Sequence, residues 1–588
     1  MNEHQVPSLI RQVEAAASAA IERARPELSG ADPLIRRSEH ADFQSNAALA
    51  LAKRATVRPA VLAAEVADEL RLDGDAPISE VTLSGPGFLN LVIKDAALWH
   101  QVAARLSSPR LGVGGPEQGR RVVIDYSGPN IAKEMHVGHL RTTIIGDCLA
   151  RVLAYLGADV VRQNHLGDWG TQFGMLIQYL DEHPDAAWRH DQLPTGDSPV
   201  SALDGLYRAA RAMFDSSPGF ADRARARVVA LQNGDQTTLG RWREIVAESE
   251  LAFGEIYSRL NVLLQPGDSV GESYYNDYLP GIVDELVSAG IAVESDGALV
   301  VLSESVTAPD GKPAVLMVRK KDGGYGYDTT DLATIRYRIQ DLKADRILYV
   351  VDARQSLHFQ LLFEVARRAG WLGPEVEVVH VAFGTVLGPD GRPFKTRSGD
   401  TVRLVQLLDE AVDKARSTVM EKNPGATGSD LALISEQAGI GAIKYADLSS
   451  SRLKDYLFDI DRMVSLSGNT SVYLQYAHAR ICSILRKADD DVAPLDPAQP
   501  LHPAERALAL ALDEFGDVLG EVAHFLEPHR LCNHLYETAK AFTDFYEECP
   551  VLSAAEPARS NRISLCRLTA RTLREGLGLL GIAAPERM

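Results

Sequence analysis

Two histidines three residues apart stand out in the stretch SGPNIAKEMHVGHLR. His136 and His139 fall where a helix is expected to begin, and a helix start offers unpaired backbone N–H groups and the positive end of the helix dipole. Lys133 adds a mobile positive charge, and Gly138 lets a ligand approach the backbone closely. The alternatives are a metal-binding pair or two histidines that only cap the helix. A metal pair lacks a third ligand nearby in the sequence, and capping alone does not call for Gly138 and Lys133 together, so we favour a polyphosphate site.

A second cationic stretch, GRPFKTRSGDTVRL, carries Lys395, Arg397 and Arg403 around a glycine-containing loop. By itself such a run is usually a solvated basic turn. It follows the last expected strand, however, and loops at the carboxyl ends of parallel strands are where α/β proteins bind ligands. Together with His136 it would form the second side of a phosphate site. The standard phosphate loops are missing, because there is no GxxxxGKS or GxxxxGKT sequence and the glycines of LGVGG precede their strand.

These residues need an α/β framework to position them. Val122–Ile124 is a short apolar run that turn-forming residues end at 127–130, as expected of a buried parallel strand. The buried stripe of the next helix ends at Leu156, Gly157 stops that helix, and a second strand begins at Val160. The pattern predicts a βαβ unit.

Strands of the same sheet are expected again much later, at Ile347–Val351 and Val376–Phe383. The intervening range Asp181–Leu264 is polar and helical in pattern, so we expect an insertion that splits the sheet. Residues 1–110 predict a small α/β unit. Helical periodicity dominates beyond Leu466, which predicts a helical bundle.

The composition is that of a globular protein with several domains. The 588 residues carry 61 Lys and Arg against 80 Asp and Glu, a net charge of -19, which disfavours nonspecific attraction to nucleic acid but allows local cationic grooves. The five cysteines are far apart and form no CxxC pair, so neither a disulfide framework nor a cysteine zinc site is predicted. Because the sequence shows neither a signal-peptide pattern nor an apolar run of transmembrane length, we expect a cytoplasmic protein without membrane attachment.

Four motifs, in this order, resemble those of arginyl-tRNA synthetases, a class I family. HVGH resembles the HIGH motif, and FKTRSGD resembles the KMSKS loop in the altered form common in this family, without the second lysine. LGDWGTQFG and YLQYAHARICSILRK are also typical of the family, and the resemblance covers essentially the whole chain. In the family a lysine just before HIGH compensates for the missing one, and Lys133 matches that position.

The resemblance implies an α/β fold with a Rossmann-like parallel-sheet catalytic domain, a helical insertion, an N-terminal α/β domain and a C-terminal α-helical anticodon-binding bundle. The implied bounds are 1–112 for the N-terminal domain, which reads the tRNA D-loop, 113–465 for the catalytic domain with an insertion at about 181–326, and 466–588 for the bundle. The implied activity is the ATP-dependent attachment of L-arginine to tRNA(Arg) through an arginyl-adenylate, for protein synthesis. Arginine activation is then expected only when tRNA is present.

The resemblance also assigns residues to each ligand. It places catalysis on four residues, His136, His139, Lys133 and Lys395. It places ATP contacts on His136, Gly138, His139, Lys395 and Arg397. It places the arginine pocket on Asp125, Asn130, His136, Tyr327, Asp331 and Gln355. It places tRNA contacts on Phe88 and Asn90 of GPGFLN and, in the bundle, on Tyr473, Tyr476, Arg480, Tyr546 and Met588.

The residue types suit these ligands. Carboxylates bind a planar guanidinium with paired hydrogen bonds, and Tyr327 precedes Asp331 by one helical turn, so both can face one pocket. Without the resemblance, an acid that stabilises its own helix and an ordinarily packed tyrosine would be the better interpretations. Tyr473, Tyr476 and Arg480 share one helix face that can stack exposed bases, although this spacing is more often simple helix packing.

The expected partners are tRNA(Arg), L-arginine and ATP, with magnesium bound to ATP, no dedicated protein metal site, and a monomeric chain. Two other functions fit part of the sequence. A catalytically inactive RNA-binding paralogue would keep the fold, but intact His136, His139 and Lys133 argue against it. An adenylyltransferase acting on a small molecule would share the HxGH element but gives no use for the long helical C-terminal region.

Overall fold

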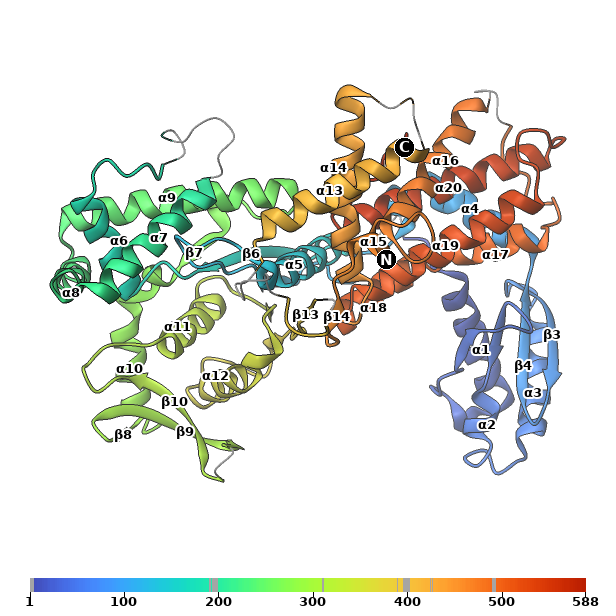
Figure 1. Ribbon diagram of the computed structural model, residues 1–588. Helices are drawn as coiled ribbons and strands as arrows, with labels where there is room; N and C mark the ends of the chain where they lie inside the picture. Colours follow the sequence, from blue (N-terminus) through green and yellow to red (C-terminus); the bar gives the residue numbers. More distant parts are fainter. Residues whose placement is uncertain are drawn as a thin grey trace.

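The computed structural model describes residues 5–189, 192, 199–308, 311–388, 390–394, 402–422, 425, 427–488 and 493–588. An N-terminal unit, a central α/β region and a C-terminal helical bundle follow one another along the chain (Figure 1). The N-terminal unit projects beside the bundle, and the α/β region extends away from both, which gives an elongated molecule. Lys395 and Arg397 of the second cationic stretch lie outside the described residues.

The N-terminal unit is a four-stranded antiparallel sheet packed against helices. Its strands, in the order β1-β2-β4-β3, are β1 (Ile35–Arg37), β2 (Phe43–Ser45), β3 (Ile78–Ser84) and β4 (Phe88–Ile93). Its helices are α1 (Leu9–Ala24), α2 (Ala47–Leu51) and α3 (Pro59–Leu72). Leu89, Leu91 and Ile93 of β4 are buried, because side chains alternate along a strand and this face carries the core. The next helix, α4 (Asp95–Ser107), leaves the unit and packs on the bundle.

A five-stranded parallel sheet forms the centre of the molecule. Its strands, in the order β12-β11-β5-β6-β7, are β5 (Arg121–Asp125), β6 (Asp159–Leu166), β7 (Ser269–Gly271), β11 (Arg346–Tyr349) and β12 (Glu377–His380). Val122, Val123 and Ile124 of β5 are fully buried, as expected for a strand in the middle of a parallel sheet. Strands β6 and β7 extend the sheet on one side of β5, and the later strands β11 and β12 extend it on the other side. The strand order therefore switches between β5 and β11. Such sheets bind ligands at this switch point, beyond the carboxyl ends of the strands.

Three helices begin near that edge and carry the site. α5 (Val137–Tyr155) follows β5, α12 (Ser356–Arg368) follows β11, and α11 (Tyr327–Gln340) precedes β11 and packs on α12. The N-termini of α5 and α12 therefore lie beyond the ends of the two strands that flank the switch point.

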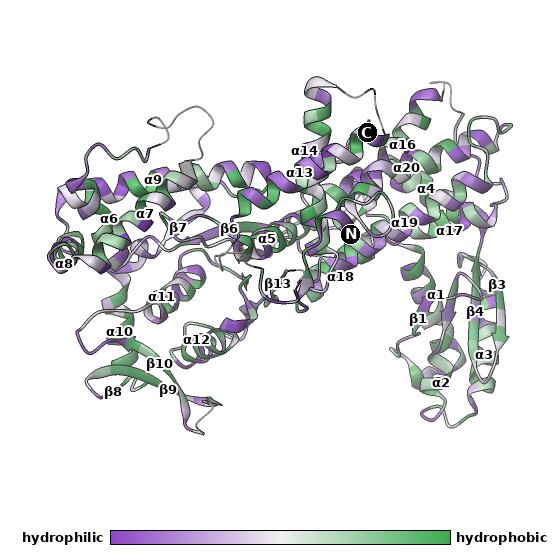
Figure 2. Ribbon diagram, in the orientation of Figure 1, coloured by the Kyte–Doolittle hydropathy of each residue, from purple (hydrophilic) through white to green (hydrophobic). Residues whose placement is uncertain are grey.

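The range 181–326, predicted as one insertion, contains a strand of the sheet. The helices α6 (Thr171–Glu182), α7 (Pro199–Ser216), α8 (Pro218–Gln232) and α9 (Gln236–Arg259) come first. The three-residue strand β7 then pairs with β6, so the chain returns to the sheet before it leaves again. The second excursion consists of η5 (Glu272–Tyr278), α10 (Leu279–Ser288), β8 (Val293–Ser295), β9 (Ala298–Thr307) and β10 (Pro313–Arg319). Strands β9 and β10 are largely hydrophobic (Figure 2), and β10 packs on α11 and α12.

Helices dominate the rest of the chain. The connecting elements are β13 (Val386–Leu387), α13 (Leu404–Lys422), α14 (Gly428–Leu448), β14 (Tyr456–Leu457) and α15 (Ile460–Met463). The bundle consists of α16 (Ser471–Lys487), α17 (Pro503–Asp513), α18 (Phe515–Phe525), α19 (His529–Glu548) and α20 (Ala558–Leu579). Among the described residues, no helix has the length and apolar content needed to span a membrane, and no three His, Cys, Asp or Glu side chains are grouped as metal ligands would be.

Candidate active site

Helix α5 begins with the HVGH sequence, and both histidines cap it. Nδ1 of His136 accepts a hydrogen bond from the backbone N–H of Gly138 (3.0 Å), and Nδ1 of His139 accepts one from the backbone N–H of His136 (3.1 Å). Burial lowers the pKa of both rings, to about 3 for His139, and Lys133 further lowers that of His136. Both rings are therefore neutral near pH 7, and a neutral imidazole whose Nδ1 accepts carries its proton on Nε2. The helix start thus holds two Nε2–H donors in fixed orientation.

Gly138 has a local reason to lack a side chain. A Cβ at this position would lie 2.7 Å from Cε1 of the His136 ring, which is too close. The sequence predicts that Gly138 makes room for a nucleotide, whereas the structure shows that it first makes room for the capping histidine. Capping and phosphate binding are compatible here, because the rings cap with Nδ1 and leave Nε2 to donate.

A cavity of about 480 Å³ lies beside this helix start. Its lining comes from the loop before α5, from α7 and from the segment before α13, and consists of Asn130, Lys133, Glu134, Met135, His136, His139, Asp204, Tyr207, Arg208 and Arg403. The Lys133 ammonium lies 5.1 Å from the centre of the Tyr207 ring, and Arg403 pairs with Glu134 at 2.5 Å. Cations and helix-start donors therefore line one cavity, an arrangement that suits a polyphosphate.

The second cationic stretch rejoins the described chain beside this helix start. The backbone N–H of Val137 donates to the carbonyl of Val402 (3.1 Å), and that of Leu404 donates to the carbonyl of Met135 (3.0 Å). These bonds flank an antiparallel bridge between His136 and Arg403. The stretch that carries Lys395 and Arg397 is thus followed directly by a segment bonded to HVGH.

The starts of α11 and α12 form a second, acidic part of the site. Tyr327 is the first residue of α11, and Asp331 follows one turn later. Nε2 of His358, on α12, is 2.7 Å from Oδ2 of Asp331, and its Nδ1 is 3.3 Å from Oδ1 of Asp328. Against the opposing effect of burial, the hydrogen bonds to Asp328 and Asp331 raise the pKa of His358 to about 9. Asp331 therefore pairs with an internal cation at neutral pH.

Glu272, at the start of η5, lies close enough to Asp331 and Asp168 to experience their charge, and it is not predicted from the sequence. Burial and, after it, the negative charges of Asp331 and Asp168 raise the pKa of its carboxyl group to about 7. Asp168 of the LGDWG motif positions the segment, because its carboxylate accepts hydrogen bonds from N (2.8 Å) and Oγ (2.6 Å) of Ser273. A half-buried carboxyl group with a raised pKa beside other acids is a candidate binding group. Its only sequence signal is its place just after a three-residue strand.

Asp125, predicted to contact the substrate guanidinium, has an internal partner in the structure. Nη2 of Arg338, on α11, donates to Oδ2 of Asp125 (2.8 Å), and its Nε donates to Oε1 of Gln163 (2.7 Å). The side chains of Arg338 and Asp125 are 1% and 14% exposed. One carboxylate oxygen of Asp125 is therefore paired with an internal guanidinium, and a direct contact with a substrate guanidinium stays a prediction. Asp125 fastens α11 to the end of β5.

Asn130, Gln355 and Tyr327 lie at the rim of the site. Asn130 forms a parallel bridge with Gly167 of the LGDWG motif, and its side chain is exposed. Gln355 is exposed at the N-cap of α12. Tyr327 is 68% exposed, and its ring centre lies 5.4 Å from that of His358. These three side chains are accessible to a ligand, in contrast to Asp125.

The residues predicted to contact tRNA in the N-terminal unit lie on β4. Asn90 and the half-buried Phe88 are on the strand face opposite Leu89 and Leu91. Oδ1 of Asn90 accepts from Nε2 of Gln44 (2.8 Å), and its Nδ2 donates to Oγ of Ser84 (3.1 Å). These bonds use half of the amide's capacity and fix its orientation. One N–H and one oxygen lone pair remain for a base edge.

The predicted anticodon contacts meet on the surface of α16 and α19. The Arg480 guanidinium lies 4.4 Å from the centre of the Tyr546 ring, which joins the two helices. Tyr476 is 44% exposed and Tyr473 is half-buried. Met588 ends the chain and packs, partly buried, on the main core.

Three family models match successive parts of the chain. The model for class I tRNA synthetases (R), catalytic domain, matches residues 101–460. The model for the DALR anticodon binding domain matches residues 474–588, and the model for the arginyl tRNA synthetase N terminal domain matches residues 11–93.

Similar proteins match over the full length. An arginine--tRNA ligase from Frankia casuarinae is 73% identical over 100% of both chains, and one from Streptomyces coelicolor is 50% identical over 99% of this chain and 100% of its own. Arginyl-tRNA synthetase structures from Plasmodium falciparum (TM-score 0.82) and Thermus thermophilus (TM-score 0.81) are each 27% identical. They cover 99% and 98% of this chain and 100% of their own. With a catalytic-domain match over more than half its length and curated relatives this similar, the chain belongs to the class I arginyl-tRNA synthetase family.

Proposed function

We propose that this protein attaches L-arginine to tRNA(Arg) for protein synthesis, through an arginyl-adenylate. The observation that carries the proposal is the start of α5, where two Nε2–H donors and Lys133 line one cavity, while the acidic pair Asp328 and Asp331 lies at the start of α11 beside His358. The arginine carboxylate attacks the α-phosphorus of ATP and pyrophosphate leaves. A terminal ribose hydroxyl of the tRNA then attacks the arginyl carbonyl carbon, and AMP leaves.

In this proposal the first step needs positioned positive charge and no protein nucleophile. His136, His139 and Lys133 stabilise the charge that develops on the phosphate oxygens, and Lys395 and Arg397 add further positive charge. Gly138 allows the capping geometry that aims His136. Magnesium arrives with ATP and neutralises part of the phosphate charge.

Arginine lies in the acidic pocket. Asp331 binds the guanidinium with its free lone pairs, Glu272 adds a second carboxylate, and Tyr327 covers the pocket from the rim. Asn130, His136 and Gln355 hold the amino-acid end of the substrate. Asp125 contributes through Arg338, which it keeps in place beneath the pocket.

The tRNA contacts two surfaces of the protein. Phe88 stacks on an unpaired D-loop base while the free half of the Asn90 amide bonds its edge. Tyr473, Tyr476, Arg480, Tyr546 and Met588 contact anticodon nucleotides. The protein acts in the cytoplasm as a monomer. Sedimentation of the protein alone and with tRNA checks the oligomeric state.

The test is arginine-dependent exchange of pyrophosphate into ATP, with tRNA present. Removing one preorganised donor by His139→Ala should lower the rate by about 10²–10³. His100→Ala, an exposed histidine on α4, is the matched control and should keep the wild-type rate. A wild-type rate in His139→Ala contradicts the proposal.

A further inference from the structure

The loop between β5 and α5 has an unusual backbone. Ser127 and Ala132 have φ angles of +76° and +60°, in the left-handed region that residues with a side chain seldom adopt. Between them lies Asn130, and Lys133 follows directly. Such conformations persist when surrounding groups hold them, often at functional sites. The contacts that hold this loop therefore determine where Asn130 and Lys133 lie.

Tyr257, on α9, holds the first end of the loop. Its hydroxyl lies 2.7 Å from Oγ of Ser127 and accepts a hydrogen bond from Nδ2 of Asn164 (3.2 Å). Oδ1 of Asn164 in turn accepts from the backbone N–H of Gly128 (2.9 Å). Burial raises the pKa of Tyr257 to about 12, so the hydroxyl keeps its proton at neutral pH and shares a hydrogen bond with Oγ of Ser127. The Tyr257 hydroxyl thus contacts Ser127 directly and Gly128 through the side chain of Asn164.

Ser249, two turns earlier on α9, holds the second end. Its Oγ accepts from the backbone N–H of Ala132 (3.0 Å) and donates to the carbonyl of Ile245 (2.8 Å). The side chain is 1% exposed, so water does not compete for these bonds. Ser249 and Tyr257 are eight residues apart and therefore lie on the same side of the helix.

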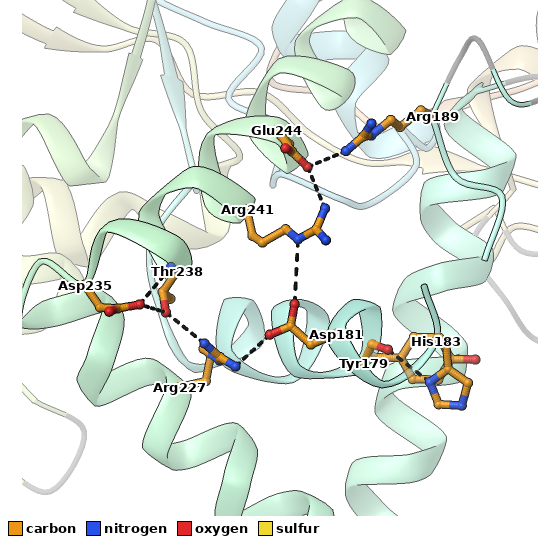
Figure 3. Close-up of polar contacts among 9 residues, drawn as sticks. All are labelled: Tyr179, Asp181, His183, Arg189, Arg227, Asp235, Thr238, Arg241 and Glu244. Carbon is orange, nitrogen blue, oxygen red and sulfur yellow. Dashed lines mark hydrogen bonds and ion pairs between the residues drawn. The ribbon is translucent and has the colours of Figure 1, made fainter. Parts of the chain in front are cut away.

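Helix α9 is itself clamped in place (Figure 3). Asp181 of α6 accepts from Arg227 of α8 at 2.6 Å and lies 3.6 Å from Arg241 of α9. One residue further along α9, Nε1 of Trp242 donates to the carbonyl of Asp168 (2.8 Å). Contacts from α6, α8 and the LGDWG segment thus hold α9, and the C-terminal half of α9 contacts the loop through Ser249 and Tyr257.

We infer that Tyr257 and Ser249 are positioning residues for the reaction. Tyr257 sets the part of the loop that presents Asn130 to arginine, and Ser249 sets the part that presents Lys133 to the phosphates of ATP. Neither touches a substrate. The inference rests on the proposed function, and it adds that the helical insertion aligns the two halves of the site.

Tyr257→Phe and Ser249→Ala each remove one hydroxyl from the buried contact. Loss of one such hydrogen bond should raise the arginine KM about fivefold in Tyr257→Phe and the ATP KM about fivefold in Ser249→Ala, with a smaller change in the other KM. The matched controls are Tyr155→Phe, a half-buried tyrosine whose buried hydroxyl has no hydrogen-bond partner among the described residues, and Ser435→Ala, which loses only an intrahelical bond. Both controls should keep wild-type KM values.

Hydrogen exchange measured by mass spectrometry over residues 121–135 gives a readout independent of activity. Amide exchange in this segment should become faster in both variants and stay unchanged in both controls. A lower unfolding temperature with wild-type KM values and wild-type exchange in the loop overturns the inference. A wild-type protein that fails to activate arginine contradicts the proposed function instead, and the exchange experiment still decides whether α9 holds the loop.

Discussion

Asp125→Asn tests how the structure uses the carboxylate at the end of β5. The change removes the negative charge that pairs with Arg338, whose side chain is 1% exposed, while that of Asp125 is 14% exposed. Removing one partner of a buried ion pair costs about 3–5 kcal/mol, because the other charge stays buried without compensation. Gln163 still accepts one hydrogen bond from Arg338, so we expect the lower end, about 3 kcal/mol.

The assay is urea denaturation, combined with the arginine KM from pyrophosphate exchange. Asp159→Asn is the control, because Asp159 pairs with Arg121 on the surface, where the side chains are 63% and 43% exposed, and such a pair contributes less than about 1 kcal/mol. Asp125→Asn should lower the free energy of unfolding far more than the control does. Unchanged stability with a raised arginine KM would refute the reasoning and would indicate that Asp125 contacts the substrate guanidinium directly.

Three further predictions concern the acidic pocket. Asp331→Asn should raise the arginine KM at least tenfold and leave the ATP KM unchanged, since a charge-assisted hydrogen bond to the guanidinium is lost; equal changes in both would contradict this role. The pKa of Glu272 is about 7 and a bound guanidinium lowers it, so the arginine KM should fall as pH rises towards 7 and level off above it. Glu272→Gln should flatten that profile. The pKa of His358 is raised from 6.5 to about 9, so its contribution to stability, about 3 kcal/mol, is complete below pH 6.5 and lost as pH rises through 9. Urea denaturation of wild type and His358→Gln at pH 6 and pH 9.5 checks this. From pH 6 to pH 9.5 the wild type should lose more stability than His358→Gln does, and an equal loss in the two proteins would contradict the prediction.

The parts of the fold with strong local patterns are predictable from the sequence. The apolar run Val122–Ile124 predicts β5, and the capped, periodic segment after HVGH predicts α5. The helical bundle beyond residue 466 follows from its periodicity in the same way. Strand β7 does not, because three residues are too few to show a period, and its place in the sheet depends on pairing with β6, more than 100 residues earlier.

The site is predictable only where chemistry and local sequence coincide. The two histidines and Lys133 are recognisable because they stand together at a helix start. Glu272 is missed, since its contribution depends on burial beside a residue from another element. The internal partner of Asp125 is not predictable for a related reason: Arg338 is 213 residues away, and nothing in the sequence shows that its guanidinium pairs with this carboxylate.

The most direct test of the account is a crystal structure of the protein with arginine and a non-hydrolysable ATP analogue. We predict that the phosphates lie within hydrogen-bonding distance of Nε2 of His136 and Nε2 of His139. The guanidinium should lie between Asp331 and Glu272. Both molecules bound at another place in the protein would contradict the account.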